Sequence, residues 1–382
     1  MIPVCELSKC NGCQACLNTC PANAIVPIKD KMDRTAYYID ETTCIHCEKC
    51  QAVCQVNNPV SSFTPHFVLA AYSRDSEDKK LSASGGIASV ASRTIIEKGG
   101  YVVGAACVDQ KTQHIMIEST NDISLLRGSK YERSDVSFIF REIKEKLKDN
   151  KEVLFTGTPC QVAGLKLYLQ SAYENLYTMD LICHGTAPHD YVLDHIRYKT
   201  AKSWSHYTFR GKDDFWFCIY SGKAIMYRRQ SISDEYFVAY LNGLIFCHNC
   251  YNCPYAKKER VADITVGDFW GLDRDSLEKS YDGKISVVLV NTSQGERLWS
   301  FFKDKIIFEE RTMEEAANEF QTNLNGPSLM HSERKVFERY YPKYGFEKAV
   351  RKTKLIKKIH FDYAKHCIIS LMSEFKHKLI MA

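Results

Sequence analysis

Two runs of cysteines near the start of the sequence constrain its fold more than any other feature. Each run has the pattern C-x2-C-x2-C-x3-C. Three closely spaced thiolates in a tight loop can hold three corners of an iron–sulfur cube, and the fourth corner must be filled from elsewhere in the chain. The repeat therefore predicts two 4Fe-4S clusters. The first run is Cys10, Cys13, Cys16 and Cys20, and the second is Cys44, Cys47, Cys50 and Cys54.

The spacing is that of bacterial two-cluster ferredoxins, in which each run lends its last cysteine to the other cluster. We therefore expect Cys54 to complete the first cluster (cluster one) and Cys20 to complete the second (cluster two). Pro21 follows the first run, whereas Gln55 stands where the second run would usually carry its proline. Zinc is the alternative, because C-x2-C pairs also build zinc ribbons. Four cysteines per run, twice, fit iron–sulfur better.

The 382 residues include 17 cysteines, far more than packing alone requires. The sequence has no secretory segment and no apolar run of the roughly 18 residues that a membrane-spanning helix needs. We therefore expect a cytoplasmic protein whose thiols bind metal rather than form disulfides. Cys5 is interpreted as a plain thiol and His46 as a solvated loop residue. The formal net charge of +5 counts the thiols as neutral, so it supports no nucleic-acid role.

Beyond a linker over residues 57–65, apolar runs alternate with amphipathic stretches. This alternation predicts a mixed α/β body after the small ferredoxin-type domain, an α+β or α/β fold overall. The stretch Phe215–Arg228 predicts a hairpin around Ser221-Gly222. The expected strands are Phe67–Tyr72, Tyr101–Val108, Val153–Thr156, Leu176–Cys183, Ile264–Val266 and Ile285–Val290, and the expected helices are Ile87–Lys98, Ser137–Lys148 and Gln161–Gln170.

The segment Ser84-Gly85-Gly86 precedes the expected helix Ile87–Lys98. A serine N-cap followed by two glycines lets backbone N–H groups approach an anion, so a phosphate of a nucleotide or flavin fits there. A simple helix cap explains the segment equally well.

Two further segments carry chemical signals. Thr158 and Pro159 are typical of a helix start, which puts Cys160 in the first turn, where the helix dipole lowers a thiol pKa. That position suits a metal ligand or a nucleophile. The third segment carries Cys247, Cys250 and Cys253 followed by Pro254, which repeats the ferredoxin-type ending and predicts a third cluster with its fourth ligand from afar.

Four motifs occur in a fixed order along the body. They are Ser84-Gly85-Gly86, Gly157-Thr158-Pro159-Cys160-Gln161, Asp180-Leu181-Ile182-Cys183-His184-Gly185, and Cys250-x2-Cys253 followed by Ala262-Asp263-Ile264-x2-Gly267-Asp268-Phe269-Trp270. Together they resemble the coenzyme F420 hydrogenase/dehydrogenase beta-subunit family, over nearly the whole chain to about residue 340. A two-cluster ferredoxin domain fused to such a body is a common arrangement in that family.

The resemblance implies a body that binds FAD (or FMN) and one 4Fe-4S cluster, and passes electrons between clusters and a deazaflavin through the flavin. It implies that Cys160, Cys183, Cys250 and Cys253 hold the body cluster, with Cys247 a local extra. Lys130, in a stretch that matches a family segment near the flavin, would stabilise a reduced flavin; an exposed lysine is the alternative. The expected cofactor-binding residues are Ser84, Gly85, Gly86, Gly128, Ser129, Lys130 and Thr158.

The sequence identifies neither the electron acceptor nor the catalytic residues. No G-x-G-x-x-G follows an expected strand, which removes support for an ordinary NAD site. No nickel-binding cysteine set is present, so any hydrogen activation would belong to a partner subunit. Phe269 and Trp270 are candidates for stacking near the flavin, with plain core packing as the alternative, and Cys107, Cys218 and Cys367 are interpreted as buried thiols.

The predicted organisation ends in a basic amphipathic tail. Such a helix lies on an anionic membrane, docks a partner, or packs as a solvated helix on its own body. The predicted regions are a two-cluster domain over residues 1–58, a flavin-binding part over 66–150, a third-cluster and flavin part over 151–345, and the tail helix over 346–382.

The leading hypothesis is an iron–sulfur flavoprotein oxidoreductase that passes electrons between ferredoxin-type clusters and a small two-electron acceptor. Its partners would be a small redox substrate and an electron-donor protein or partner subunit. The alternatives are a non-catalytic electron-transfer subunit of a larger complex and a cluster-based redox sensor.

Overall fold

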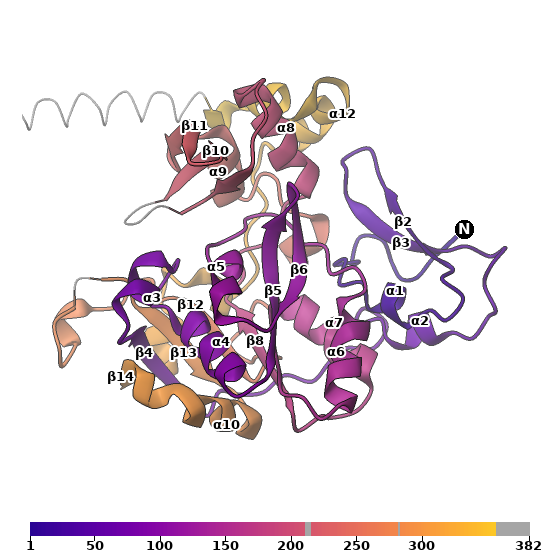
Figure 1. The fold of residues 1–382 in the computed structure, drawn as a ribbon. Coiled ribbons are helices and arrows are strands. Elements are labelled where there is room, and N and C mark those ends of the chain that lie inside the picture. The colour runs from indigo at the N-terminus through magenta and orange to yellow at the C-terminus, as the bar shows by residue number, and fades with distance from the viewer. Residues whose placement is uncertain (211–214, 282, 357–382) are drawn as a thin grey trace, which may run out of the picture. The chain divides into compact units, whose positions relative to one another are not determined.

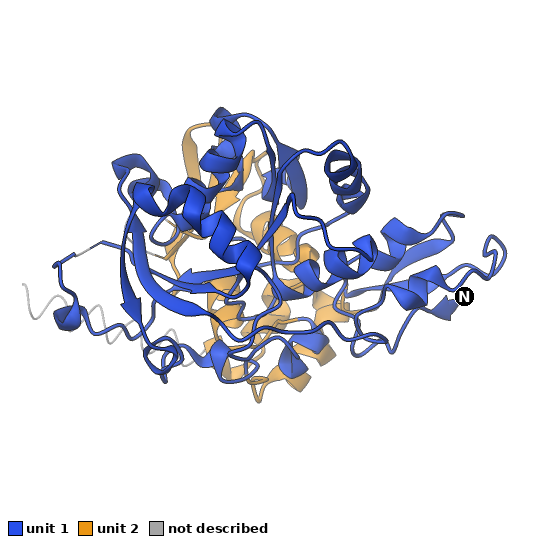
Figure 2. Cartoon of the chain, turned by 90° about the horizontal axis from the view of Figure 1, so that it is seen from below, with its two compact units in different colours: residues 1–30, 34–186, 247–328 blue, residues 31–33, 187–246, 329–382 orange. Residues whose placement is uncertain are grey.

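The computed structural model describes residues 1–210, 215–281 and 283–356, which form two compact units (Figure 2). Unit 1 contains residues 1–30, 34–186 and 247–328, and unit 2 contains residues 31–33, 187–246 and the described residues from 329 onward. Cys367 and most of the predicted basic tail lie outside the described residues. The division into four regions stays a prediction. Among the residues described, no helix is long and apolar enough to cross a membrane.

A three-stranded antiparallel sheet and two short helices form the N-terminal part of unit 1 (Figure 1). Each helix begins directly after a residue in the left-handed conformation, Gln14 at φ 63° and Glu48 at φ 57°. These turns keep the two cysteine loops tight, and cysteines of both runs share one small core. The elements are β1 (Ile2–Pro3), α1 (Ala15–Thr19), β2 (Ile25–Lys29), β3 (Thr35–Ile39) and α2 (Lys49–Ala52).

The body of unit 1 is built on an eight-stranded mixed sheet in the order β14-β4-β13-β12-β8-β7-β5-β6. The four neighbours β12, β8, β7 and β5 run parallel, and antiparallel pairings add the strands on either side. The strands are β4 (Phe67–Ser73), β5 (Tyr101–Val108), β6 (Lys111–Ile117), β7 (Val153–Gly157), β8 (Leu176–Leu181), β12 (Ile264–Asp268), β13 (Ser286–Val290) and β14 (Ile306–Arg311).

Helices cover both faces of this sheet, so most positions of its central strands β7 and β8 are buried. On β7, Leu154 packs with helices α4 and α10, whereas its neighbours Val153 and Phe155 pack with α6 and α7 on the opposite face. The helices of unit 1 are α3 (Ser76–Leu81), α4 (Ile87–Glu97), α5 (Ile123–Leu126), α6 (Ile139–Lys148), α7 (Pro159–Leu169), α10 (Ser293–Phe302) and α11 (Met313–Ala316). Short 3-10 helices are η1 (Thr120–Asp122), η2 (His248–Asn252), η3 (Arg274–Ser276), η4 (Lys303–Lys305) and η5 (Thr322–Leu324).

The structure confirms the predicted α/β fold class, the small ferredoxin-type domain and the six strands and three helices predicted between Phe67 and Val290, within a few residues at each end. The hairpin is also confirmed: Ser221 pairs with Ala224 around Gly222, which has φ 56°. It belongs to unit 2. The elements of unit 2 are α8 (His189–Lys199), β9 (His206–Thr208), β10 (Trp216–Ser221), β11 (Ala224–Gln230), α9 (Glu235–Leu241) and α12 (Arg334–Arg351), the last broken at Gly345.

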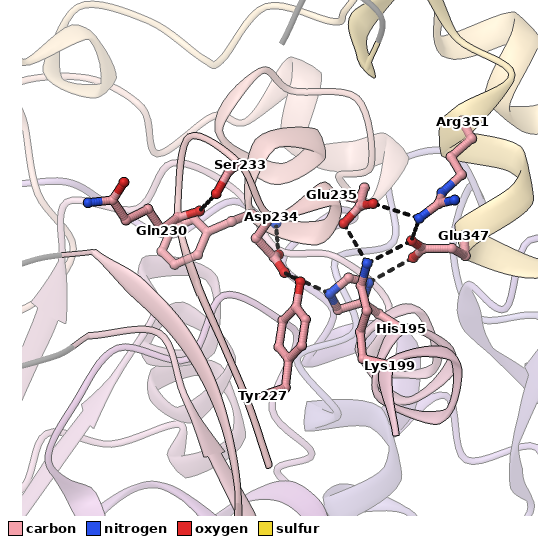
Figure 3. A network of polar contacts seen from close by, with 10 residues as sticks. His195, Lys199, Tyr227, Gln230, Ser233, Asp234, Glu235, Glu347 and Arg351 are labelled. Carbon is pink, nitrogen blue, oxygen red and sulfur yellow. Dashed lines mark hydrogen bonds and ion pairs between the residues drawn. The ribbon is translucent and has the colours of Figure 1, made fainter. Parts of the chain in front are cut away.

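A buried network of charges joins three helices of unit 2 (Figure 3). His195 on α8 is fully buried; its Nε2 lies 2.9 Å from Asp234 and its Nδ1 lies 2.9 Å from Glu347. Lys199 Nζ donates to Glu235 at 2.7 Å and to Glu347 at 3.0 Å. Burial disfavours the imidazolium of His195, but the two carboxylates more than offset this and raise its pKa to about 9.

The raised pKa of His195 predicts a pH-dependent stability. The stabilisation by the protonated ring is complete below the unfolded pKa near 6.5 and is lost as the pH rises through 9. The shift corresponds to a loss on the order of 3 kcal/mol. Unfolding at fixed pH values between 6 and 10, followed by circular dichroism, should show this loss in the native chain and not in His195→Gln. The variant of the exposed His206, His206→Gln, should keep the native profile. A flat native profile would contradict the prediction.

Candidate metal centre

The four cysteines expected to hold cluster one line one pocket. It has about 310 Å³ of space, part of it open to solvent, and its walls also include Cys5 and Tyr37. The donor chemistry fits a 4Fe-4S cluster, because cysteine thiolates are its usual ligands. Cys54 comes from the second run, as the predicted exchange of last cysteines requires. The four are Cys10, Cys13, Cys16 and Cys54.

Cys5, interpreted from the sequence as a plain thiol, has two cysteines of cluster one as neighbours. It lies against Cys10 and Cys54, which raise its pKa, and it lines the same pocket. The contact with Cys5 is also the chief cause that lowers the pKa of Cys54 to about 7 and that of Cys10 to about 6.

The cysteines of cluster two gather beside the same core. Cys20 and Cys50 are buried and pack together with the half-buried Cys44, whereas Cys47 is exposed. Burial raises the pKa of Cys50, and the charges of Cys20 and Cys44 add to the effect. His46 is exposed, as expected for a loop histidine.

All cysteines in the described part of the chain are free thiols. In the same residues, no three His, Cys, Asp or Glu side chains group closely enough to hold a single metal ion. A 4Fe-4S cube spreads its thiolates around four irons, so its ligands stand further apart than those of one ion.

The cysteines of the body meet at the carboxyl end of the parallel strands. Cys160 follows β7, Cys183 follows β8, and Cys250 and Cys253 lie at η2. Burial raises the pKa of Cys183, and the charges of Cys250, Cys160 and Cys253 raise it further. Burial likewise raises the pKa of Cys160 to about 11, with Cys253 adding to the effect. In parallel sheets this edge is the usual place for a ligand.

Cys247 lies beside this body set, and its position is compatible with both of the alternative ligand sets. It is buried, its N–H donates to the carbonyl of Thr186 at 2.7 Å, and its charge raises the pKa of Cys250. The family-based set and the contiguous trio of Cys247, Cys250 and Cys253 are therefore both close to one centre.

Helix α7 begins as predicted and presents Cys160. The N–H of Thr158 donates to Gln161 Oε1 at 2.9 Å, and Pro159 is the first helical residue. The Thr158 hydroxyl lies 3.2 Å from Cys160 Sγ. This contact places the Thr158 hydroxyl beside one of the four cysteines of the body set.

The loop of cluster one rests directly on helix α7. A Cβ on Gly164 would lie 2.8 Å from Cys13 Cβ and 2.9 Å from Cys13 Sγ, so a larger residue there would displace the loop. Gln55, directly after Cys54, donates from Nε2 to the carbonyl of Cys160 at 2.7 Å. Its Oε1 accepts from the hydroxyl of Tyr255. Gln55, which stands where the second run would usually carry its proline, thus forms a buried bridge between the loop that ends at Cys54 and the loop of Cys160.

The expectation that Ser84 caps helix α4 is wrong. The N-cap is Gly86 at φ 88°, and no side chain caps it, while Ser84 Oγ accepts from Ser286 Oγ at 2.9 Å. The N–H of Gly85 donates to Ser286 Oγ at 2.9 Å, and a Cβ there would lie 2.4 Å from the carbonyl oxygen of Ala71. Gly85 therefore serves packing against β4 and β13, and its N–H does not fit a phosphate.

The segment around Lys130 is the second place where the resemblance expects cofactor contacts. Lys130 is half-buried, so the exposed-lysine alternative is wrong; its Nζ donates to the carbonyls of Leu126 at 3.0 Å and Arg127 at 2.9 Å. Burial lowers its pKa to about 8. Gly128 has φ 82° and open space where a Cβ would stand. Of the aromatic candidates, Phe269 is in the core, as the packing alternative expects, and Trp270 is partly exposed.

Sequence reasoning missed two arginines beside the cysteines, the buried Arg260 and the half-buried Arg133. Arg260 donates to Asp180 at 3.3 Å and to the carbonyl of Tyr255 at 2.9 Å, which ties the loop after Cys253 to strand β8. Arg133 donates to Asn249 at 3.2 Å and covers Gly12. Neither arginine belongs to a motif with a recognisable spacing. Only Asp180, which lies inside one of the four family motifs, indicated this part of the site.

Comparison with known proteins gives matches in two segments. Residues 9–58 match the 4Fe-4S dicluster domain, and residues 150–316 match the family described as the C terminus of the coenzyme F420 hydrogenase/dehydrogenase beta subunit. No curated protein matches the sequence. A structure titled as a xenon derivative of the F420-reducing [NiFe] hydrogenase complex from Methanosarcina barkeri contains a chain of 18% identity. The match covers 69% of this chain and 91% of that chain, with a TM-score of 0.43.

The two matched segments confirm the resemblance that the cysteine spacing and the motifs indicated. The first matched segment contains both cysteine runs, and the second contains Cys160, Cys183, Cys247, Cys250 and Cys253. The chain thus joins a segment that matches the 4Fe-4S dicluster domain to a segment that matches the C terminus of the coenzyme F420 hydrogenase/dehydrogenase beta subunit.

Proposed function

We propose that the chain is an iron–sulfur flavoprotein oxidoreductase that passes electrons from cluster two through cluster one and the body cluster to a small two-electron acceptor. The matched segments support the coarser class, an electron-transfer oxidoreductase subunit with iron–sulfur clusters. The observation that carries the finer proposal is the bridge at Gln55, which joins the cluster-one loop to the carbonyl of Cys160.

The order of the centres follows from these contacts. Cys13 touches helix α7 at Gly164, and Cys160 lies in the first turn of that helix. Cys20 and Cys50, expected at cluster two, pack with Cys54 in the N-terminal core. Cluster one therefore lies between cluster two and the body cluster. An electron that moves from cluster two to the body cluster passes through cluster one.

The flavin would supply an exchange between one-electron clusters and a two-electron acceptor, which the clusters alone lack. The residues proposed to hold it are Gly128, Ser129, Lys130 and Thr158, of which Thr158 lies beside Cys160. Lys130 is protonated at neutral pH, since its pKa of about 8 lies above it. Its ammonium favours an anionic ligand at this edge. Ser84, Gly85 and Gly86 are the weaker candidates because their polar groups are engaged within the fold.

A non-catalytic subunit that relays electrons to a partner enzyme is the second candidate. The family of residues 150–316 is named for a beta subunit, which favours partner subunits. Turnover by the purified chain alone separates the two candidates.

Anaerobic purification followed by cofactor analysis and turnover tests the proposed function. We expect iron and acid-labile sulfide equal to three 4Fe-4S clusters, together with one flavin. The chain alone should reduce a deazaflavin or another two-electron acceptor, with the two electrons supplied one at a time by two molecules of a one-electron donor. A flavin-free chain with full iron and no such turnover would instead support the relay subunit, and a chain without iron would contradict both.

The ligand set of the body cluster is tested by three single changes. Cys160→Ser and Cys183→Ser should each remove about one cluster's iron, because each withdraws one of four proposed ligands. Cys247→Ser should keep the iron. Iron and sulfide analysis with electron paramagnetic resonance spectra measures both. Loss of iron in Cys247→Ser but not in Cys160→Ser would favour the contiguous trio.

The bridge is tested by Gln55→Leu. The change removes the bond to Cys160 and leaves the Tyr255 hydroxyl unpaired, a cost of about 1–3 kcal/mol. We expect slower electron transfer from cluster one to the body cluster with all iron retained, measured by rapid-freeze spectroscopy after injection of reductant. Gln51→Leu, at an exposed position on α2, is the matched control. Equal rates in both variants would show that the bridge does not serve transfer.

A further inference from the structure

Arg133 lies between the cluster-one loop and the body cysteines. A Cβ on Gly12 would lie 2.5 Å from its Nη1 and 3.0 Å from its Cζ, so the guanidinium occupies the space over that glycine. Gly12 lies in the pocket lined by Cys10, Cys13, Cys16 and Cys54, and its φ of 66° favours glycine. No larger residue at position 12 would leave the guanidinium where it is.

The other side of the guanidinium faces the body set. Arg133 Nη2 donates to Asn249 Oδ1 at 3.2 Å, and Asn249 Nδ2 lies 3.8 Å from Cys250 Sγ. One side chain thus contacts the loops of two cysteine sets that lie far apart in the sequence.

The charge of Arg133 has thiolates as its counterparts. Within the described residues, Arg133 forms no ion pair with a carboxylate. Burial disfavours its charge, but Cys247, Cys250, Cys10 and Cys160 outweigh burial and raise its pKa. A half-buried cation without a carboxylate partner is costly unless other negative charge offsets it.

We propose that Arg133 is a shared cation that raises the reduction potentials of cluster one and the body cluster together. The proposal rests on the proposed function, because it needs both centres loaded. Each cluster gains one negative charge when it accepts an electron, so a nearby cation favours the reduced form. When an electron passes between them, one cluster is oxidised and the other reduced by one electron, and the shared cation stays close to that electron throughout.

The loss of a shared cation changes the reduction potentials of both clusters in the same direction. Removing it lowers both potentials in the same sense, so the difference between them changes less than either value. Cluster two, whose cysteines are not among the largest causes of the raised pKa of Arg133, should keep its potential.

Redox titration of the clusters in the full chain, followed by electron paramagnetic resonance, tests the proposal. In Arg133→Gln, we expect the midpoint potentials of two clusters to fall while the third is unchanged and the iron content is full. Arg133→Lys keeps the charge and should retain most of the native potentials. Arg297→Gln, which removes an exposed arginine whose contacts are Glu152 and Glu174, is the control and should change none.

Three unchanged potentials in a fully loaded Arg133→Gln chain would overturn the proposal and leave Arg133 a packing residue. If that variant loses iron, Gly12→Ala gives the same test, since it keeps the arginine and displaces its guanidinium. A fall confined to the same two clusters supports the proposal there, and no fall overturns it. A native chain without three clusters would instead refute the proposed function.

Discussion

Helix α7 and the first cysteine loop pack so closely that one additional carbon atom at the contact would clash. Gly164 presents bare backbone to Cys13, and Gln55 fixes the same interface through the carbonyl of Cys160. Gln14 adds a second attachment, with its Nε2 donating to Asp135 at 2.7 Å. Arg141 adds a third, donating to the carbonyl of Asn18 at 2.8 Å. The ferredoxin-type domain is therefore packed onto the body, and one cysteine set is built against the other.

Collecting this many thiols in one place carries an electrostatic cost. Burial and mutual repulsion raise the pKa values of Cys13 to about 12 and of Cys250 to about 12, so these groups are thiols in the unmetallated chain. Metal binding must then release their protons, and its free energy becomes part of the folding free energy. Arg133 and the start of helix α7 offset part of the resulting charge. The geometry is held by neutral contacts such as Gln55, which need no charge to form.

The sequence predicted the elements whose signals are local. The parallel strands are rich in apolar residues because both faces of the sheet are covered, although β8 also carries the buried Thr178 and Asp180. The eight N-terminal cysteines follow a fixed spacing. Strands β6 and β14 were missed, since polar residues such as Gln113 and Glu309 interrupt them at the sheet edges. The local sequence pattern around Ser84 indicated a helix cap. Its actual hydrogen-bond partner, Ser286, lies 202 residues away in the sequence and so leaves no local signal. Gln55, Arg133 and Arg260 act through contacts of the same long-range kind, which no local pattern records.

The body cysteines come together although unit 2 interrupts the chain between them. The segment 187–246 leaves unit 1 after Cys183 and returns just before Cys247. At that point the N–H of Cys247 donates to the carbonyl of Thr186 at 2.7 Å, and the N–H of Thr186 lies 3.5 Å from Cys250 Sγ. Closing a loop becomes only slowly more costly as it lengthens. The hydrogen bond between Cys247 and Thr186 thus joins the two ends of segment 187–246 whatever that segment contains. The segment can therefore carry its own buried core without changing the geometry of the cysteine set.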